Sequence, residues 1–448
     1  MDAQEPIRLR TNEKKSLKNS VTFRILIITV LALLLLIPSM MVQSLISERQ
    51  STSEETTNEV SSKWSYAQTV TGPVLNVPYQ VWEKTSEKEG HYEKHTAHFL
   101  PENLKTSCEL VPELRHRGIF DVVVYTAKIR FSGEFRAPDL SEWTSTPENI
   151  SWDKVSLDLA LSDLRGIENQ AFIKFGNDSL YFEPGLNNTD FSEAGVSTKL
   201  VAQGAASLNR SFECELTLKG SNNIGFTPLG KLSSVEVSST WPSPSFNGSF
   251  LPDSSVITDK GFVANWQVLH LNRNFPQQWT DGTDALHNSD FTVDFFVPAD
   301  QYQQSMRTVK YAFMFIALTF ILFFFVEVFN KKNIHPIQYL LVGLVLVMFF
   351  TLLISISEHL GFDWAYLISA TAVVVLITVY VKAVLDSGKL SLITAGVLVI
   401  LYGFIYITLQ LEDYALLMGS IGLFVILAII MIFSRKINWY EVAQNNQA

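Results

Sequence analysis

Two long apolar runs, separated by a short polar turn, constrain this 448-residue chain more than any other feature. The first run covers residues 311–326 and the second covers 337–356, and neither contains a charged side chain. Each approaches the ~20 residues that cross a hydrocarbon core of ~30 Å at 1.5 Å per residue. The intervening turn, residues 330–336, is long enough only to reverse the chain direction. The pattern therefore predicts a transmembrane helical hairpin.

Four further apolar runs bring the predicted number of membrane spans to six. One lies near the N-terminus, at residues 25–42, and follows a polar segment with several basic side chains. Its length and the poor cleavage site at residues 39–44 favour an uncleaved signal anchor over a signal peptide. The other three follow the hairpin, at residues 364–385, 390–409 and 414–433.

The charges in the short connectors predict the orientation of the spans. Cytoplasmic connectors are enriched in Lys and Arg. Here the basic connectors alternate with connectors that carry only acidic residues, so both termini are expected in the cytoplasm and residues 48–308 outside. The basic side chains are Lys331, Lys332, Lys382, Lys389, Arg435 and Lys436, and the acidic ones are Glu358, Asp363, Glu412 and Asp413.

The segment between the first and second spans reads as a soluble β domain. Apolar and polar residues alternate in several runs, for example at residues 123–131, 212–218 and 262–268, and turn signals separate them. Alternation with a period of two is typical of strands with one buried face. We therefore expect an α+β membrane protein with a large, mainly antiparallel β domain of sandwich type. The expected divisions are 1–24 (cytoplasmic), 25–46 (anchor helix), 47–308 (periplasmic β domain), 309–434 (five-helix bundle) and 435–448 (cytoplasmic tail).

Composition excludes some partners. The formal charge of −10 argues against nucleic-acid binding, which needs a concentrated basic face. The two cysteines, Cys108 and Cys214, both fall in the predicted external domain, where a disulfide is allowed. Cys214 also lies on the apolar face of its predicted strand, so a buried thiol is equally consistent, and the sequence leaves the choice open.

Sequence motifs give no support for catalysis, a metal or a cofactor. His91, His95 and His98 form the closest histidine cluster, but the surrounding residues favour a loop entering a strand. On a strand His95 and His98 would point to opposite faces, so solvated histidines are the simpler interpretation. The sequence contains no nucleophile elbow, zinc-protease motif, P-loop or dinucleotide fingerprint.

Ionisable residues gather at the ends of the spans and not in their middles. Glu327 is expected at the cytoplasmic end with Lys331 four residues later, whereas Glu358 and His359 are expected at the outer end. The charge-free span interiors disfavour an ion-coupled transporter, and Gly396, Gly403, Gly419 and Gly422 predict close helix packing. Our candidate functional or coupling residues are Asp300, Tyr302, Arg307, Lys310, Glu327, His335, Glu358 and His359.

A Trp-Pro-rich stretch in the β domain has two interpretations. Trp241, Phe246 and Phe250 could form a docking surface, since aromatic anchors dominate interfaces. The simpler and favoured interpretation is that they pack an irregular edge of the β domain.

Several of these segments resemble the CreD family of inner-membrane proteins. The resemblance covers nearly the whole chain. It is carried by residues 298–302, 307, 310–312, 316–320 and 327 at the first hairpin helix, by 335–344 and 357–359 in the second, and by 72–73, 162–167, 241–246 and 250–252 in the β domain. It implies a Gram-negative inner-membrane protein associated with envelope integrity, tolerance to certain colicins and control by the CreBC two-component system. It implies no catalytic residue or cofactor.

We therefore expect a non-enzymatic inner-membrane protein whose periplasmic β domain docks a periplasmic or outer-membrane component. Its other expected partners are membrane lipids, and the sequence does not determine the oligomeric state. Two alternatives stay open: a transporter or channel for an uncharged or lipidic substrate, and a membrane-bound enzyme that modifies the envelope near Glu358 and His359.

Overall fold

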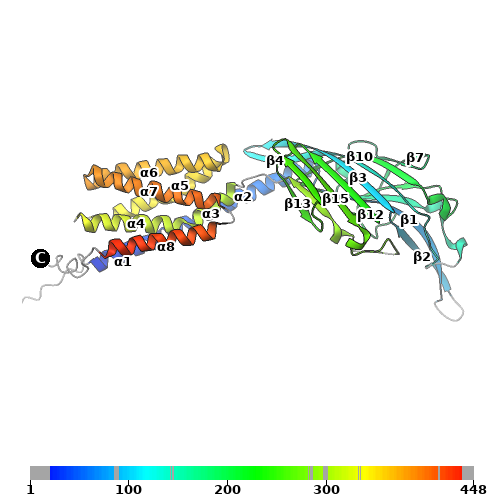
Figure 1. The fold of residues 1–448 in the computed structure, drawn as a ribbon, viewed down its shortest axis with the longest axis horizontal. Coiled ribbons are helices and arrows are strands. Elements are labelled where there is room, and N and C mark those ends of the chain that lie inside the picture. Colours follow the sequence, from blue (N-terminus) through cyan, green and yellow to red (C-terminus); the bar gives the residue numbers. More distant parts are fainter. Residues whose placement is uncertain are drawn as a thin grey trace, which may run out of the picture. The chain divides into compact units, whose positions relative to one another are not determined.

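The computed structural model describes residues 21–435, except 85–89, 142, 144–145, 281, 283–285, 296–300, 331, 333 and 412–413. It divides into two compact units. One unit comprises residues 1–51 and 299–448 and contains the membrane helices, and the other comprises residues 52–298 and contains the β-sheets. Figure 1 shows the helices and the strands of these two units.

The helical unit confirms the predicted anchor and five-helix bundle. The described part of the chain has six helices long and apolar enough to cross a membrane, one near the N-terminus and five after the β domain. Within the described residues the α-helices are α1 (Val21–Leu34), α2 (Leu36–Trp64), α3 (Gln301–Lys310), α4 (Ala312–Phe329), α5 (Pro336–Leu360), α6 (Phe362–Leu385), α7 (Gly388–Gln410) and α8 (Ala415–Ser434).

Local sequence signals explain where the spans begin. The helix α5 starts with Pro336 at its first turn, where the missing N–H costs nothing, and His335 caps it by accepting a hydrogen bond from the Ile337 N–H at 3.3 Å. The reversal into α6 occurs at Gly361, whose φ of 76° lies in the left-handed region that favours glycine. Ser387 caps α7 in the same way as His335 caps α5, with its hydroxyl accepting from the Leu390 N–H at 3.5 Å.

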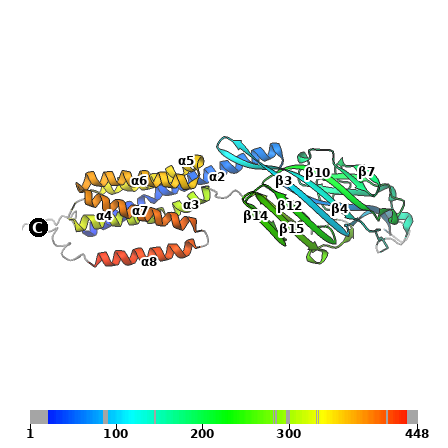
Figure 2. The same ribbon diagram turned by 45° about the horizontal axis from the view of Figure 1, so that its top comes forward.

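The β unit consists of two mainly antiparallel sheets, which confirms the predicted fold class (Figure 2). One sheet has nine strands and contains the path β13-β17-β11-β1-β5-β9-β8, with β2 and β16 joined to it through β1. The other has eight strands in the order β14-β15-β12-β3-β4-β10-β6-β7. The only parallel neighbours among the described pairs are β1 with β11 and β12 with β3.

The strand bounds follow the predicted alternation at most sites. The strands of the nine-stranded sheet are β1 (Gln68–Lys84), β2 (Gly90–Phe99), β5 (Ser156–Leu161), β8 (Glu183–Pro184), β9 (Gly195–Lys199), β11 (Asn223–Phe226), β13 (Pro244–Gly248), β16 (Gln278–Thr280) and β17 (Phe291–Phe295). The strands of the eight-stranded sheet are β3 (Asn103–Arg117), β4 (Phe120–Glu134), β6 (Phe172–Phe175), β7 (Asp178–Tyr181), β10 (Ser211–Ser221), β12 (Leu232–Ser239), β14 (Ser254–Thr258) and β15 (Gly261–Leu269).

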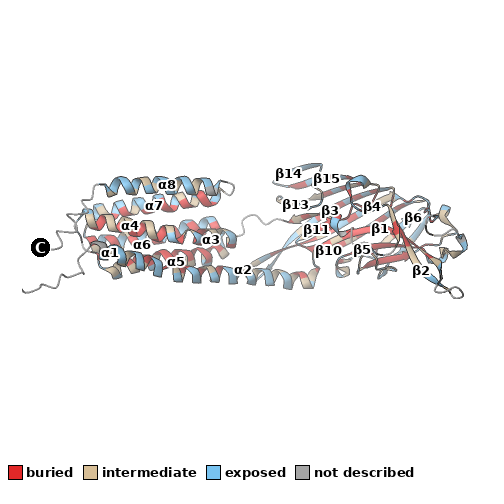
Figure 3. Cartoon of the chain, turned by 90° about the horizontal axis from the view of Figure 1, so that it is seen from below, coloured by how far each residue is buried: buried red, intermediate tan, exposed pale blue. Residues whose placement is uncertain are grey.

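One hydrophobic core lies between the two sheets. Trp266 of β15 stacks on Phe291 of β17 with ring centroids 4.8 Å apart, and Tyr125 of β4 lies 5.2 Å from Phe295 of β17. Because each pair joins one sheet to the other, these rings pack the sheets face to face as a sandwich. Figure 3 shows the buried faces of the strands in red, whereas α8 in the helical unit is exposed or half-buried from residue 417 to residue 434.

Two helices, α2 and α3, cross the domain boundaries that the sequence predicted. The anchor helix was expected to end at residue 46, but α2 continues to Trp64, so the Ser/Thr/Glu-rich stretch after the anchor is helical. The β unit ends at Pro298, ten residues before the expected boundary of 308. Residues 301–310 form α3, whose buried Tyr302 and Val309 attach this segment to the helical unit.

The sheet register decides the question of the disulfide. Cys108 lies on β3 opposite Ile129 of β4, and Cys214 lies on β10 opposite Phe131 of β4. The strand β4 therefore separates the two cysteines, which places their backbones about two strand spacings, ~9.6 Å, apart. This exceeds the ~7 Å limit for a bridge. Both cysteines are free and buried.

Candidate functional site

The first cluster of candidate residues surrounds Glu327, on the last turn of α4. This carboxylate is only 3% exposed. It accepts a hydrogen bond at 2.8 Å from the guanidinium of Arg24 on α1, and another at 2.9 Å from the hydroxyl of Tyr339 on α5. Each of its two oxygens thus has a partner, and three helices meet at one buried charge. Burying a carboxylate without such partners would be costly.

A pocket of about 480 Å³ opens beside this cluster. Its lining includes Arg24, Glu327, His335 and Tyr339. The backbone N–H of His335 also donates to the side chain of Gln338 at 2.9 Å, which completes the cap of α5. The predicted residues Glu327 and His335 are therefore brought together at one end of the bundle. The predicted partner Lys331 lies outside the described residues.

The second cluster surrounds Glu358, near the end of α5. The hydroxyl of Tyr302 on α3 donates to its Oε1 at 3.2 Å, and Nε of Arg49 on α2 lies 3.9 Å from the same atom. The Glu358 side chain is 8% exposed and that of Arg49 is 47% exposed. The structure thus brings the predicted residues Tyr302 and Glu358 together and adds an arginine from the N-terminal helices.

The N-terminal helices contact the α4–α5 hairpin through both clusters. Arg24 and Arg49 are 25 positions apart, which corresponds to about 37 Å of helix at 1.5 Å per residue. This is close to the ~40 Å of a bilayer with its interfacial regions. Each arginine pairs with one glutamate of the hairpin, at 2.8 Å for Arg24 and at 3.9 Å for Arg49, so the first span contacts the bundle near both of its ends.

The other predicted coupling residues differ in their exposure where the structure describes them. Lys310 and His359 are exposed, Arg307 is half-buried on α3, and Asp300 lies outside the described residues. Sequence reasoning missed Arg49 and Tyr339 as partners. Arg24 stands at the edge of the first apolar run, and that position was the available signal for a charge that could reach the bundle.

The predicted docking aromatics have a packing role in the structure. Trp241 lies 5.9 Å from Phe295 and its indole N–H donates to the Ser243 carbonyl. Phe246 contacts the ring of Trp266 at 5.5 Å. All three predicted aromatics, including Phe250, are half-buried and pack against the sandwich core. Their arrangement corresponds to the simpler interpretation, an irregular packed edge.

An exposed edge lies close by in sequence. The strand β14 ends the eight-stranded sheet and pairs only with β15 among the described strands. All five of its residues are exposed, and among them Val256 and Ile257 are 67% and 50% exposed. An edge strand with unpaired backbone groups and exposed apolar side chains is a ready template for another strand.

The histidines of β2 do not converge. The sequence predicted a loop entering a strand, with His95 and His98 on opposite faces and with solvated histidines. The strand is confirmed and includes all three histidines, but the expectation of a solvated side chain is wrong for His98, which is 0% exposed. His98 is buried, with Nδ1 2.7 Å from Asn76 and Nε2 3.1 Å from Asp190, whereas His95 stacks on the ring of Tyr79. Within the described residues, no three His, Cys, Asp or Glu side chains are grouped so that they could hold a metal ion.

Comparison with known proteins gives a consistent match over this whole layout. The family model described as "Inner membrane protein CreD" matches residues 20–440. The inner membrane protein CreD of Escherichia coli (strain K12) is 33% identical to this chain over 413 residues, which is 91% of each chain. The matched range includes every helix and strand described above.

Proposed function

Because the chain belongs to the CreD family of inner-membrane proteins, we propose that it supports the integrity of the cell envelope without being an enzyme. In this proposal the six helices hold the protein in the inner membrane as a multi-pass protein. Both termini are cytoplasmic, and residues 48–308 lie in the periplasm, as the basic and acidic connectors predict. Colicin tolerance and membership of the CreBC regulon are parts of the same proposal.

The β domain would act by docking an envelope component. The observation that carries this step is the fully exposed edge strand β14, with Val256 and Ile257 on it. Backbone groups of such an edge pair with an extended segment of a partner, and alternate side chains provide selectivity. We accordingly move the proposed docking surface from Trp241, Phe246 and Phe250 to β14.

The two glutamate clusters support a structural role for the helices. Both carboxylates are already engaged by an arginine and a tyrosine, as in a fastened bundle. A transporter or channel for an uncharged or lipidic substrate is the second candidate, and an apolar groove among α4, α7 and α8 favours it. The envelope-modifying enzyme has less support, because Glu358 is paired and His359 is exposed.

The docking step can be tested in intact cells with the full-length chain. A photoreactive amino acid at Val256 should crosslink one defined envelope component, whereas the same group at Val201, a loop residue that is 91% exposed, should not. The variant Val256→Lys should also fail to restore detergent resistance to cells that lack the protein, while Val201→Lys should restore it. Equal crosslinking and equal rescue at both positions would refute docking through β14.

A further inference from the structure

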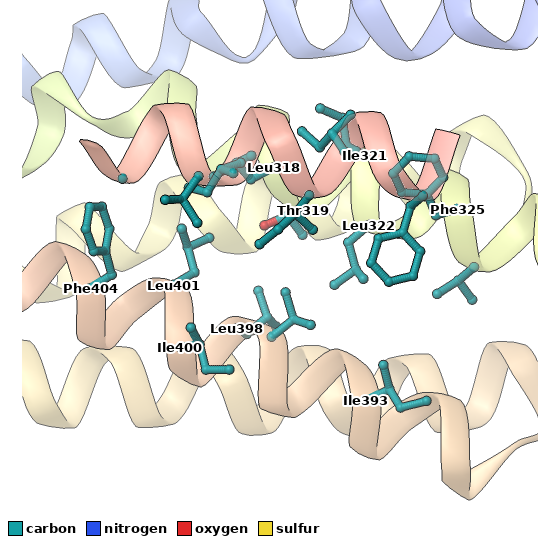
Figure 4. Close-up of a pocket in the computed structure, with 18 of the residues that line it drawn as sticks. Leu318, Thr319, Ile321, Leu322, Phe325, Ile393, Leu398, Ile400, Leu401 and Phe404 are labelled. Carbon is teal, nitrogen blue, oxygen red and sulfur yellow. The ribbon is translucent and has the colours of Figure 1, made fainter. Parts of the chain in front are cut away.

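An apolar groove lies among α4, α7 and α8 in the helical unit (Figure 4). Its volume is about 730 Å³, within the range of ~300–1,000 Å³ typical of ligand sites. The residues that line it include no charged side chain, and only Thr319 and Asn330 are polar. Aliphatic and aromatic side chains such as Leu322, Phe325 and Leu398 make up the rest.

The helix α8 contacts its neighbours at two points along the groove. At one point Gly422 packs directly against the ring of Phe404 on α7. At the other, Phe433 lies 6.3 Å and 6.5 Å, between ring centroids, from Phe325 and Phe329 on α4. No described residue of α8 is buried. The groove therefore runs along α8 past the glycine contact and up to the aromatic contact, since Met418 and Phe433 both line it.

The hydroxyl of Thr319 distinguishes this groove from an ordinary lipid-facing surface. Thr319 is 1% exposed, lines the groove, and its Oγ1 has no hydrogen-bond partner among the described residues. Four other threonines of this unit donate to the carbonyl four residues earlier: Thr308, Thr378, Thr394 and Thr408. An unsatisfied buried hydroxyl is unfavourable. A ligand with an acceptor oxygen at this position would remove that cost.

The size of the groove selects the kind of occupant. Met418 and Phe433 both line it and are separated by about 22 Å of helix at 1.5 Å per residue. A long space of about 730 Å³ with an almost wholly apolar lining fits a hydrocarbon chain.

The position of Thr319 along α4 indicates the chemical class of the ligand. It lies seven residues from the start of α4 and ten from its end, so it is near the middle of the span. The charged headgroup of a phospholipid would be strongly disfavoured at that depth. We propose that the groove binds an uncharged long-chain membrane molecule bearing one acceptor oxygen, with its chain along α8 and its oxygen at the Thr319 hydroxyl. This site is independent of the docking step proposed for the β domain.

The test uses the full-length chain in lipid nanodiscs and two photoreactive probes. One probe is a long-chain ketone, and the other is the matched hydrocarbon in which CH₂ replaces the carbonyl. The ketone should label groove residues of α4 and α8 and bind more tightly than the hydrocarbon. The variant Thr319→Val should weaken ketone binding about three- to tenfold, the value of one neutral hydrogen bond, and leave the hydrocarbon unaffected.

A matched pair of tryptophan variants tests the groove itself. Ile426 lines the groove, whereas its neighbour Leu427 is 56% exposed. Ile426→Trp should abolish labelling of the groove, and Leu427→Trp should leave it intact. Equal labelling in these two variants would overturn the site. Equal binding of the ketone and the hydrocarbon, unchanged by Thr319→Val, would overturn the role of the oxygen.

Discussion

Arg24 and Glu327 are 303 positions apart in the chain, yet Nη1 of the arginine lies 2.8 Å from Oε1 of the glutamate. The pair joins α1 to α4, and the whole β domain lies between these two helices in the sequence. The first span is therefore part of the bundle and does more than anchor the chain. The second oxygen of Glu327 is satisfied by Tyr339, so the pairing depends on three helices at once.

The first prediction concerns this pair. Replacing Arg24 by Gln should leave the Glu327 carboxylate buried with only the tyrosine as partner. Breaking a buried pair from one side costs about 3 kcal/mol or more. We expect a loss of this order in the free energy of unfolding, measured for the full chain by titration with sodium dodecyl sulfate.

A double variant provides the control. In Arg24→Met combined with Glu327→Met, no charge is left without its partner, and most of the lost stability should return. If the single variant Arg24→Gln unfolds at the same detergent fraction as the parent protein, the ion pair has no structural role.

The second prediction separates two residues of α3. Tyr302 is 5% exposed and donates to Glu358, whereas Lys310 is exposed. Tyr302→Phe removes a hydrogen bond to a charged group and should cost about 1.5 kcal/mol of unfolding free energy. Lys310→Ala should change it by less than about 0.5 kcal/mol, as at other surface positions. Equal effects in the same titration would remove Tyr302 from the coupling residues.

Much of the fold could be predicted from the sequence, because spans and strands are local patterns. The uninterrupted apolar run at 337–356 predicts α5, and the alternation at 212–218 predicts β10, without knowledge of any neighbour. The clusters are different, since they join residues hundreds of positions apart. Nothing near Glu358 in the sequence indicates Arg49, and the ends of the first span do not reveal which hairpin residue each arginine meets.

The docking aromatics illustrate the same limit. In the sequence, Trp241 and Phe246 are consistent with an interface as well as with the favoured packed edge, because large apolar rings serve both. Only the register of β13 against β17 shows that Phe246 faces Val293 and lies within reach of Trp266. The exposed strand β14 has fewer aromatic residues and gave no comparable signal.

The third prediction concerns the thiols. Burial raises the pKa of Cys214 to about 12 and that of Cys108 well above its ordinary value, so both thiols stay protonated at neutral pH. In the native protein a maleimide reagent should modify neither cysteine. After denaturation without reductant it should modify both. A denatured protein that needs reductant before it reacts would contradict the separation of the cysteines across β4.

The fourth prediction is a pH dependence of the β domain. Asp158 of β5 is fully buried, and burial raises its pKa from 3.8 to about 6, although the Ser156 hydroxyl and the Asn187 N–H donate to it and act to lower the pKa. The native state therefore binds the proton more tightly than the unfolded state. The contribution of Asp158 to the free energy of unfolding is therefore fully present below pH ~4. It decreases by up to about 3 kcal/mol as the pH rises to about 6 and beyond.

The comparison uses Asp158→Asn, which cannot titrate. Hydrogen exchange of the amides of β5 reports the local opening free energy between pH 4 and 7, after correction for the intrinsic exchange rate. In the parent protein this free energy should decrease with pH, and in the variant the decrease should vanish. Parallel pH profiles for the two proteins would show that Asp158 does not titrate in this range.

The last prediction concerns the glycines of the spans. The sequence predicted close packing at Gly396, Gly403, Gly419 and Gly422, but only at Gly422 would an added Cβ meet a neighbouring side chain. The close approach that the pattern did not reveal is at Gly343, where a Cβ would collide with Leu35 and press on Phe320. Leu35 is fully buried at the junction of α1 and α2, so it has little room to move.

Gly343→Ala should therefore lower the free energy of unfolding by about 1–3 kcal/mol, the usual cost of overpacking. Gly396→Ala is the matched control, since its Cβ would meet nothing within 4 Å, and it should be neutral or slightly stabilising. The shortened side chain in Leu35→Ala should partly rescue Gly343→Ala, because it removes the colliding atoms. If Gly343→Ala is as stable as Gly396→Ala, the first span does not pack against α5 at this point.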